Sequence, residues 1–173
     1  WLAGKAPKPA EPVPEKPAEP VVAAPAPAGS KPRVRITTTH GALVVELDPD
    51  KAPASVANFL KYAGKGHYEG TIFHRVIPNF MIQGGGYQQD YREKPTDPPI
   101  PIESSNGLSN VRGTLAMART NDPNSATSQF FVNTVDNLFL NYQSPSNPGY
   151  TVFGRVVEGM ETVDRIRAIP TGP

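Results

Sequence analysis

The alternation of apolar and polar residues predicts a pair of strands where the regular part of the chain begins. Val34 and Ile36 alternate with Arg and Thr, and a similar alternation continues over residues 43–47. A period of two is typical of strands that bury one face. His40 and Gly41 lie between the two runs and have the composition of a turn, so this region is predicted to form a β-hairpin.

Two later stretches have the apolar spacing of amphipathic helices. Pro53 suits the first turn of one helix, which we expect to end near Gly64. Gly159 precedes the other helix. The apolar face of this second helix would consist of Met160, Val163 and Ile166.

Shorter apolar runs predict the remaining strands. They cover residues 71–76, 81–83, 113–118, 129–133 and 151–158. Residues 87–109 are polar and Pro-rich and predict a surface loop, and residues 136–140 predict a short helical turn. Many short strands with two helices predict a mainly β protein, a closed barrel with capped ends. A barrel of about eight strands is filled by its own side chains, so a peptide site would lie on its outer surface.

Residues 1–32 differ in composition from the rest of the chain. They consist mainly of Pro, Ala, Glu and Lys, and they lack Phe, Tyr, Ile and any apolar periodicity. Such a segment cannot bury enough apolar surface to offset the entropy of ordering it. We expect a disordered Pro/Ala-rich arm that acts as an extended spacer and is dispensable for activity. Alternatively, the arm is a ligand for a partner domain or for the protein's own pocket.

Composition excludes several classes of function. The 17 Lys and Arg residues nearly balance the 16 Asp and Glu residues, so a net charge of +1 gives no reason to expect nucleic acid as a partner. The absence of cysteine excludes disulfides, thiolate metal sites and a cysteine nucleophile. No apolar run approaches the length of a membrane span. The histidines lack metal-ligand spacing, and we expect neither a metal nor a cofactor.

The most informative stretch runs from Phe73 to Gly86 and has the sequence FHRVIPNFMIQGGG. It contains a single arginine, Arg75, among apolar residues and no carboxylate. A buried guanidinium would need a partner for its charge. We therefore interpret Arg75 as an arginine at the rim of an apolar pocket, with its stem packed and its head free to bind. The final glycines allow close backbone approach or positive φ, and no Lys-Ser/Thr follows them as in a phosphate-binding loop.

Three blocks of sequence resemble the cyclophilins, the cyclosporin-sensitive class of peptidyl-prolyl cis-trans isomerases. The first block is the stretch just described. The second comprises GTLAMAR at residues 113–119 and SATSQFFVN at residues 125–133, and the third is YTVFGRVV at residues 150–157. The blocks occur in the family's order and look closest to the bacterial, periplasmic-type branch. The resemblance implies a closed eight-stranded antiparallel β-barrel capped by two α-helices, formed by residues 33–173.

The resemblance also implies roles for individual residues. Arg75 would be the catalytic arginine, because a guanidinium aimed at the prolyl nitrogen stabilises the twisted amide. The proline ring would enter a dry apolar slot. The residues lining this slot would be Phe80, Met81, Phe131 and Leu140. Gln83 and the backbone of Arg119 would bind the substrate main chain, and Gln129 would orient Arg75 from behind. Without the resemblance, the apolar members of this set would be interpreted as ordinary core residues.

Three predicted substrate-binding positions depart from the animal members of the family. Phe139 and Tyr150 stand where those proteins carry Trp and His, and Arg119 stands where they carry Asn. The Trp of the animal proteins uses its indole N–H to bind the backbone of cyclosporin, and Phe has no such donor. Cyclosporin A is therefore expected to bind weakly.

The resemblance implies an enzyme that isomerises X-Pro bonds in peptides and in unfolded or folding client proteins, as a monomer. The alternative is a non-catalytic chaperone module that binds proline segments and is tethered by its arm. The branch implies a periplasmic location, with the cytoplasm as the alternative. The chain begins without Met and ends before the last strand that family members place beside Val34. We expect that an upstream piece has been removed and that the natural C-terminus lies further on.

Overall fold

The computed structural model describes residues 16–19 and 31–171. Its strands are β1 (Lys16–Glu19), β2 (Arg33–Thr38), β3 (Gly41–Leu47), β4 (Arg75–Ile77), β5 (Met81–Gly84), β6 (Thr114–Met117), β7 (Phe130–Asn133) and β8 (Val152–Glu158). Its helices are α1 (Pro53–Gly64), α2 (Met160–Arg167) and the short 3₁₀ helix η2 (Leu138–Leu140). No helix within the described residues has the length and apolar character needed to cross a membrane.

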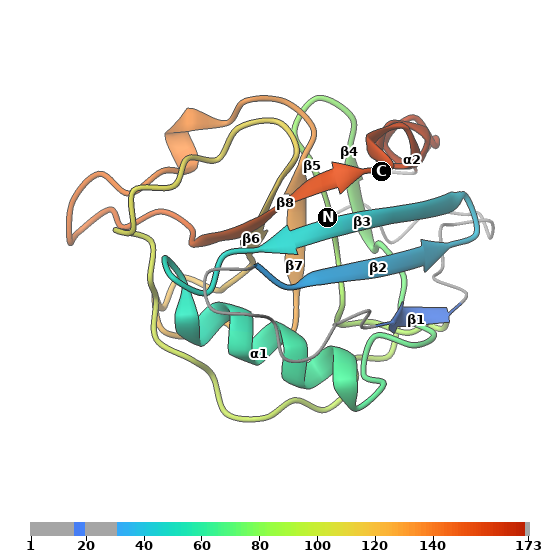
Figure 1. The fold of residues 1–173 in the computed structure, drawn as a ribbon, viewed down its shortest axis with the longest axis horizontal. Helices are drawn as coiled ribbons and strands as arrows, with labels where there is room; N and C mark the ends of the chain where they lie inside the picture. Colours follow the sequence, from blue (N-terminus) through green and yellow to red (C-terminus); the bar gives the residue numbers. More distant parts are fainter. Residues whose placement is uncertain (1–15, 20–30, 172–173) are drawn as a thin grey trace.

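The strands form one antiparallel sheet that curls around the core (Figure 1). Within the described residues the order is β1-β2-β3-β8-β6-β7-β5-β4. The two outer strands, β1 and β4, are not paired with each other in this part of the chain. The predicted mainly β fold with two α-helices is thus confirmed. Closure into an eight-stranded barrel is not confirmed and stays a prediction.

The free edge of β2 is occupied by β1, a strand that the sequence did not predict. Lys16 pairs with Thr37 and Glu19 pairs with Arg35, in antiparallel register. The composition of the arm gives no sign of this strand, because main-chain pairing at a sheet edge requires no apolar side chain. The rest of the arm lies outside the described residues, and its disorder stays a prediction.

The strand that carries Arg75 is shorter than its apolar run suggested. The run at residues 71–76 predicts a strand, but β4 begins only at Arg75. Thr71 instead forms an isolated bridge with Gln88, in the loop of residues 87–109. This first part of the run is therefore buried against a loop, which an apolar pattern alone cannot distinguish from a sheet.

Alternation along β5, β6 and β7 separates two apolar clusters. One set of side chains joins the main core, together with Phe59 of α1 and Ile166 of α2. These side chains are Ile82, Leu115 and Val132. Their strand neighbours form a second, smaller cluster. These neighbours are Met81, Ala116 and Phe131. Because neighbouring side chains point to opposite faces of a strand, the smaller cluster lies on the outer face of the sheet.

The helix α1 lies at the opposite end of the curled sheet from α2 and depends on a distant residue at its start (Figure 1). It begins at Pro53 and has no side-chain cap of its own. The carboxylate of Glu103 accepts hydrogen bonds from the main-chain N–H groups of Ala54, over 3.0 Å, and of Ser55, over 2.8 Å. An acceptor with negative charge at the first turn stabilises a helix. The loop of residues 87–109 thereby anchors α1.

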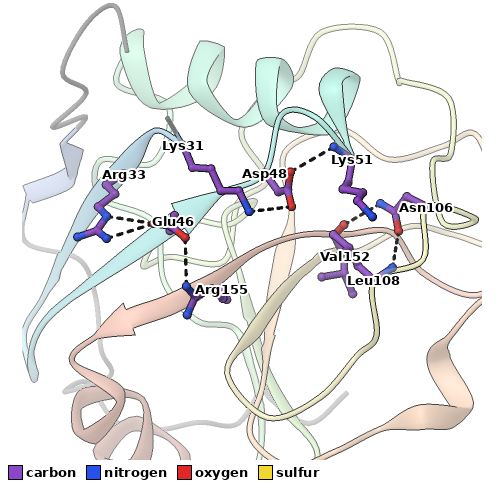
Figure 2. A network of polar contacts seen from close by, with 9 residues as sticks. All are labelled: Lys31, Arg33, Glu46, Asp48, Lys51, Asn106, Leu108, Val152 and Arg155. Carbon is purple, nitrogen blue, oxygen red and sulfur yellow. Dashed lines mark hydrogen bonds and ion pairs between the residues drawn. The ribbon is translucent and has the colours of Figure 1, made fainter. Parts of the chain in front are cut away.

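A network of charged side chains lies across β2, β3 and β8 (Figure 2). Glu46 on β3 accepts hydrogen bonds from Arg33 on β2, over 3.1 Å, and from Arg155 on β8, over 3.2 Å. Beside it, Lys31 pairs with Asp48 over 3.3 Å. The cations are substantially exposed, so each pair adds about 1 kcal/mol or less to stability. The network fits the register of the three strands.

Candidate functional site

The hairpin of β4 and β5 places the arginine of the central stretch on the outer face of the sheet. Arg75 pairs with Gln83, and Ile77 pairs with Met81. Residues two apart on a strand share a face, so Arg75, Gln83 and Met81 all lie beside the outer apolar cluster. The turn that follows Ile77 contributes Phe80 to the same area.

The strand β7 and the helix η2 supply the opposite wall. Phe131 pairs with Gln83 across the two strands, and its ring meets that of Tyr150 edge-on with centroids 5.7 Å apart. Leu140, at the end of η2, is buried. These elements form a cavity of about 450 Å³, part of it open to solvent, which we call the outer cavity. The side chains lining it are Arg75, Phe80, Met81, Gln83, Ala118, Arg119, Phe131, Leu140 and Tyr150.

The predicted site residues therefore lie together, with two exceptions. Phe139 is at the rim rather than in the lining: it is 64% exposed, and its ring stacks on Phe80 with centroids 5.8 Å apart. Gln129 also lies outside the lining. Ala118, which follows β6, is an addition that the sequence did not single out, because a small apolar residue carries no chemical signal.

The side chain of Gln129 is hydrogen-bonded to Gln83. Nε2 of Gln83 donates a hydrogen bond to Oε1 of Gln129 over 2.9 Å. Gly86 makes room for this amide, since a Cβ atom at that position would lie 2.6 Å from the Gln129 side chain. Within the described residues no hydrogen bond joins Gln129 to Arg75, and a role of Gln129 in orienting Arg75 stays a prediction. Gln129 instead fixes the amide of Gln83.

The guanidinium of Arg75 has an unused donor. Its Nε is buried and makes no hydrogen bond to any part of the chain that the structure describes. A buried donor without an acceptor costs free energy that a ligand can recover by supplying the acceptor. The buried Nε agrees with the interpretation that the stem of Arg75 is packed, and the place of Arg75 in the lining of the outer cavity agrees with a head that faces a ligand.

The side chain of Arg119 holds the far wall of the outer cavity. Its Nε and Nη2 donate to the carbonyl of Gly149 over 3.0 and 2.8 Å, and its Nη1 donates to the carbonyl of Thr120 over 2.8 Å. The guanidinium also lies over the ring of Tyr150, 4.6 Å from its centroid, in a cation–π contact. Gly149 has a φ of +68°, which favours glycine. The resemblance gives Arg119 a main-chain role, and the structure adds this clamp on Tyr150.

Three buried asparagines support two walls of the outer cavity. Nδ2 of Asn137 donates to the carbonyl of Phe80 and to Oδ1 of Asn133, both over 2.8 Å. Nδ2 of Asn133 donates to Oδ1 of Asn110 over 3.0 Å, and Nδ2 of Asn110 donates to the carbonyl of Leu140 over 3.2 Å. A connected buried network of this kind is rigid. These asparagines could not be predicted as site residues from the sequence, because asparagine usually marks a turn.

We expect Asn137→Ala to lower the free energy of unfolding by about 2 kcal/mol, because it leaves Oδ1 of Asn133 buried without its donor. Unfolding in denaturant measures the change. Asn147→Ala is the matched control, since Asn147 is exposed and a surface substitution usually changes stability by about 0.5 kcal/mol or less. Equal losses in the two variants would contradict a special contribution from the buried network.

His74, the neighbour of Arg75, is kept neutral by its surroundings. Burial, and to a smaller extent the charge of Arg75, lowers the pKa of His74 from 6.5 to about 4. Its Nδ1 is buried without a hydrogen bond inside the described part of the chain, and its ring lies 4.6 Å from that of Tyr87. At neutral pH, His74 therefore adds no positive charge beside Arg75.

We expect His74 to make the protein less stable as the pH falls from 6.5 to about 4. In this window the unfolded chain binds a proton at His74 and the folded chain does not, so stability that is present above pH 6.5 is lost. The full loss from this residue is on the order of 3 kcal/mol. His74→Phe keeps a ring against Tyr87 but cannot titrate, and denaturant unfolding at neutral and acid pH compares the two proteins. The same pH dependence in both would contradict the lowered pKa.

A second cavity, beside the charged network, offers no comparable group. It spans about 640 Å³, part of it open to solvent, and its lining includes Glu46, Asp48 and Arg155. Glu46 and Asp48 are already paired with cations, as Figure 2 shows. Within the described residues, no group of three or more His, Cys, Asp or Glu side chains could hold a metal ion. The outer cavity is therefore the candidate functional site.

Known proteins share both the sequence blocks and the fold. The sequence profile described as "Cyclophilin type peptidyl-prolyl cis-trans isomerase/CLD" matches residues 33–173. The peptidyl-prolyl cis-trans isomerase cyp18 of Streptomyces antibioticus is 55% identical over 141 residues, which cover 80% of this chain and 85% of the relative. The peptidyl-prolyl cis-trans isomerase B of Escherichia coli is 54% identical over 141 residues, which cover 80% of this chain and 86% of the relative.

A solved structure agrees with these sequence matches. The crystal structure of a cyclophilin type peptidyl-prolyl cis-trans isomerase from Cryptosporidium parvum, in the presence of the dipeptide Ala-Pro, has a TM-score of 0.70 at 33% identity. The match covers 80% of this chain and 86% of that one. The chain therefore belongs to the cyclophilin-type peptidyl-prolyl cis-trans isomerase family. This confirms the family and the enzyme class predicted from the three sequence blocks.

Proposed function

We propose that the outer cavity isomerises X-Pro bonds in peptides and in unfolded or folding client proteins. The observation that carries this proposal is the place of Arg75, with its unpaired Nε, in the wall of the outer cavity beside the apolar cluster of Met81, Phe131 and Leu140. Rotation about an X-Pro bond requires no acid, base, nucleophile or metal. It requires amide resonance to be broken, against a barrier of about 18–20 kcal/mol.

The catalytic step would be stabilisation of the twisted amide. When the bond is twisted, the prolyl nitrogen becomes pyramidal and gains a lone pair, and the guanidinium of Arg75 supplies a donor for it. A rate acceleration of about 10⁵-fold needs about 7 kcal/mol of such differential stabilisation. Met81, Phe131 and Leu140 would surround the proline ring and exclude water, which strengthens the interaction with Arg75.

The substrate main chain would be held at the polar side of the same cavity. The amide of Gln83 is fixed by Gln129 and is available in the lining. The main chain of Arg119 follows Ala118 in the opposite wall, and the Arg119 side chain is occupied by carbonyl groups of the protein itself. The relative from Cryptosporidium parvum, solved in the presence of Ala-Pro, supports a proline peptide as the ligand.

We also propose that the sheet closes into the eight-stranded barrel of the family, and its curled antiparallel form supports this. The strands β2 to β8 already bend around a common core, with α1 and α2 at its two ends (Figure 1). In either form of the sheet, the outer cavity lies on the face directed away from this core.

The proposal is tested by NMR exchange spectroscopy on an Ala-Ala-Pro-Ala peptide, in which uncatalysed isomerisation takes tens of seconds or longer. We expect catalytic amounts of the protein to bring the exchange into the range of seconds or faster. Shifts that report peptide binding without any acceleration would overturn the enzymatic proposal and favour the non-catalytic proline-binding module.

A further inference from the structure

Large exposed apolar side chains gather at one end of the outer cavity. Among the described residues, four such side chains are exposed: Tyr91 at 42%, Leu138 at 57%, Phe139 at 64% and Tyr142 at 39%. Three of them flank Leu140, which lines the cavity. Neighbouring exposed apolar groups of this size often mark a binding surface. We call Leu138, Phe139 and Tyr142 the apolar shelf.

The apolar shelf is continuous with the outer cavity. The helix η2 turns Leu140 inward, to 9% exposure, and leaves Leu138 and Phe139 exposed. Phe139 stacks on Phe80, with an angle of 19° between the ring planes, and Phe80 lines the outer cavity. The shelf thus begins where the cavity wall ends.

A further shallow cavity adjoins the other side of the apolar shelf. Tyr142 contributes to it, and it spans about 530 Å³, part of it open to solvent. The remaining lining residues are Ser104, Ser105, Gly107, Leu108, Ser109 and Asn141. Leu108 also packs against the apolar cluster that floors the outer cavity. An extended segment that leaves the outer cavity over Phe80 would therefore meet the shelf and then this hollow.

The shelf lies away from the polar groups of the site. On the hairpin of β4 and β5, Arg75 pairs with Gln83 at one end, whereas Ile77 pairs with Met81 next to the turn that carries Phe80. Two residues along a strand span about 7 Å. The groups that would bind the substrate main chain are thus at the Gln83 end, and the apolar shelf is at the turn end.

We propose that the apolar shelf binds an apolar or aromatic side chain that flanks the proline of the client. The inference rests on the proposed isomerase function and adds a sequence preference to it: unfolded segments with Leu, Phe or similar residues within a few positions of proline. Residues 138–142 include no charged side chain, so a charged flanking residue gains nothing there. Contact between apolar side chains removes water from both surfaces and is favourable.

The test compares five peptides and three proteins. One peptide is Ala-Ala-Pro-Ala, and the others replace one flanking Ala by Leu or Phe on either side of the proline. The proteins are the wild type, the double variant Leu138→Ser/Tyr142→Ser, and Tyr91→Ser. Tyr91 is the matched control because it is a tyrosine of similar exposure, 42% against 39% for Tyr142, and is not part of the shelf. NMR titration gives Kd and exchange spectroscopy gives kcat/KM for each combination.

We expect the wild type to bind the best Leu- or Phe-containing peptide about 3- to 10-fold more tightly than the Ala peptide, as partial burial of one such side chain allows. The double variant should lose this preference and keep kcat/KM on the Ala peptide within about twofold, and Tyr91→Ser should behave as the wild type. A double variant that keeps the preference, or a wild type that has none, overturns the proposal. A preference in Kd that the double variant loses, without turnover of any peptide, would retain the shelf and overturn the isomerase function instead.

Discussion

Arg75→Ala is expected to lower kcat/KM for an Ala-Pro peptide at least about tenfold, a loss of about 1.4 kcal/mol or more in transition-state stabilisation. The variant removes the donor that would meet the lone pair of the twisted nitrogen, an interaction absent from the planar substrate. The free energy of unfolding should change little, because the buried Nε of Arg75 has no acceptor among the described residues to leave unpaired. Exchange spectroscopy and denaturant unfolding measure the two quantities.

Two further variants test whether the effect depends on the guanidinium geometry and on the position of the arginine. Arg75→Lys keeps a positive charge but lacks the planar guanidinium, so we expect it to recover only part of the lost turnover. Arg33→Ala removes an exposed arginine of the charged network, away from the outer cavity, and should leave turnover unchanged. Near-normal turnover of Arg75→Ala would refute the proposed mechanism.

Phe139→Trp is expected to raise the affinity for cyclosporin A about 5- to 150-fold. An acceptor on the drug that is desolvated without a donor costs about 1–3 kcal/mol, and the indole N–H of a tryptophan would supply that donor. Phe139 lies at the rim, 64% exposed and stacked on Phe80, so a larger ring can be accommodated there. Turnover should stay within a few-fold of the wild type, because Arg75 and the cavity lining are unchanged.

Titration of the drug against turnover measures this prediction in both proteins. Leu138→Trp is the control, because it adds the same indole one position away, at a side chain that does not stack on Phe80. We expect it to gain little affinity. Equal inhibition constants for the wild type and Phe139→Trp would show that Phe139 does not set drug sensitivity, and Arg119 and Tyr150 would be the next positions to test.

The sequence determined those elements whose burial repeats at a fixed local period. Residues in β2 and β3 alternate between the core and the solvent, and α1 and α2 bury residues at helical spacing, so both hairpin and helices were predicted close to their observed bounds. The lone Arg75 in an apolar stretch, together with the resemblance of three blocks, also indicated which residues would meet in the site. These signals are local, so they can be recognised in a single sequence before its fold is known.

Only the tertiary structure decided which face each apolar residue occupies. Met81 and Ile82 are both buried, as are Phe131 and Val132, so their burial does not distinguish a core residue from a site residue. The register between β5 and β7 puts Ile82 and Val132 opposite each other in the main core. Met81 and Phe131 consequently lie on the outer face. A short strand without polar alternation leaves this choice open until its neighbours are in place.

The contacts that hold the site in shape were also invisible in the sequence. Glu103 stabilises the start of α1 from 48 residues away along the chain, Asn137 binds the carbonyl of Phe80 from 57 residues away, and Arg119 clamps Gly149 from 30 residues away. Such hydrogen bonds join single residues across long separations, so they produce no period in the sequence. They arise only once the strands have brought these residues together.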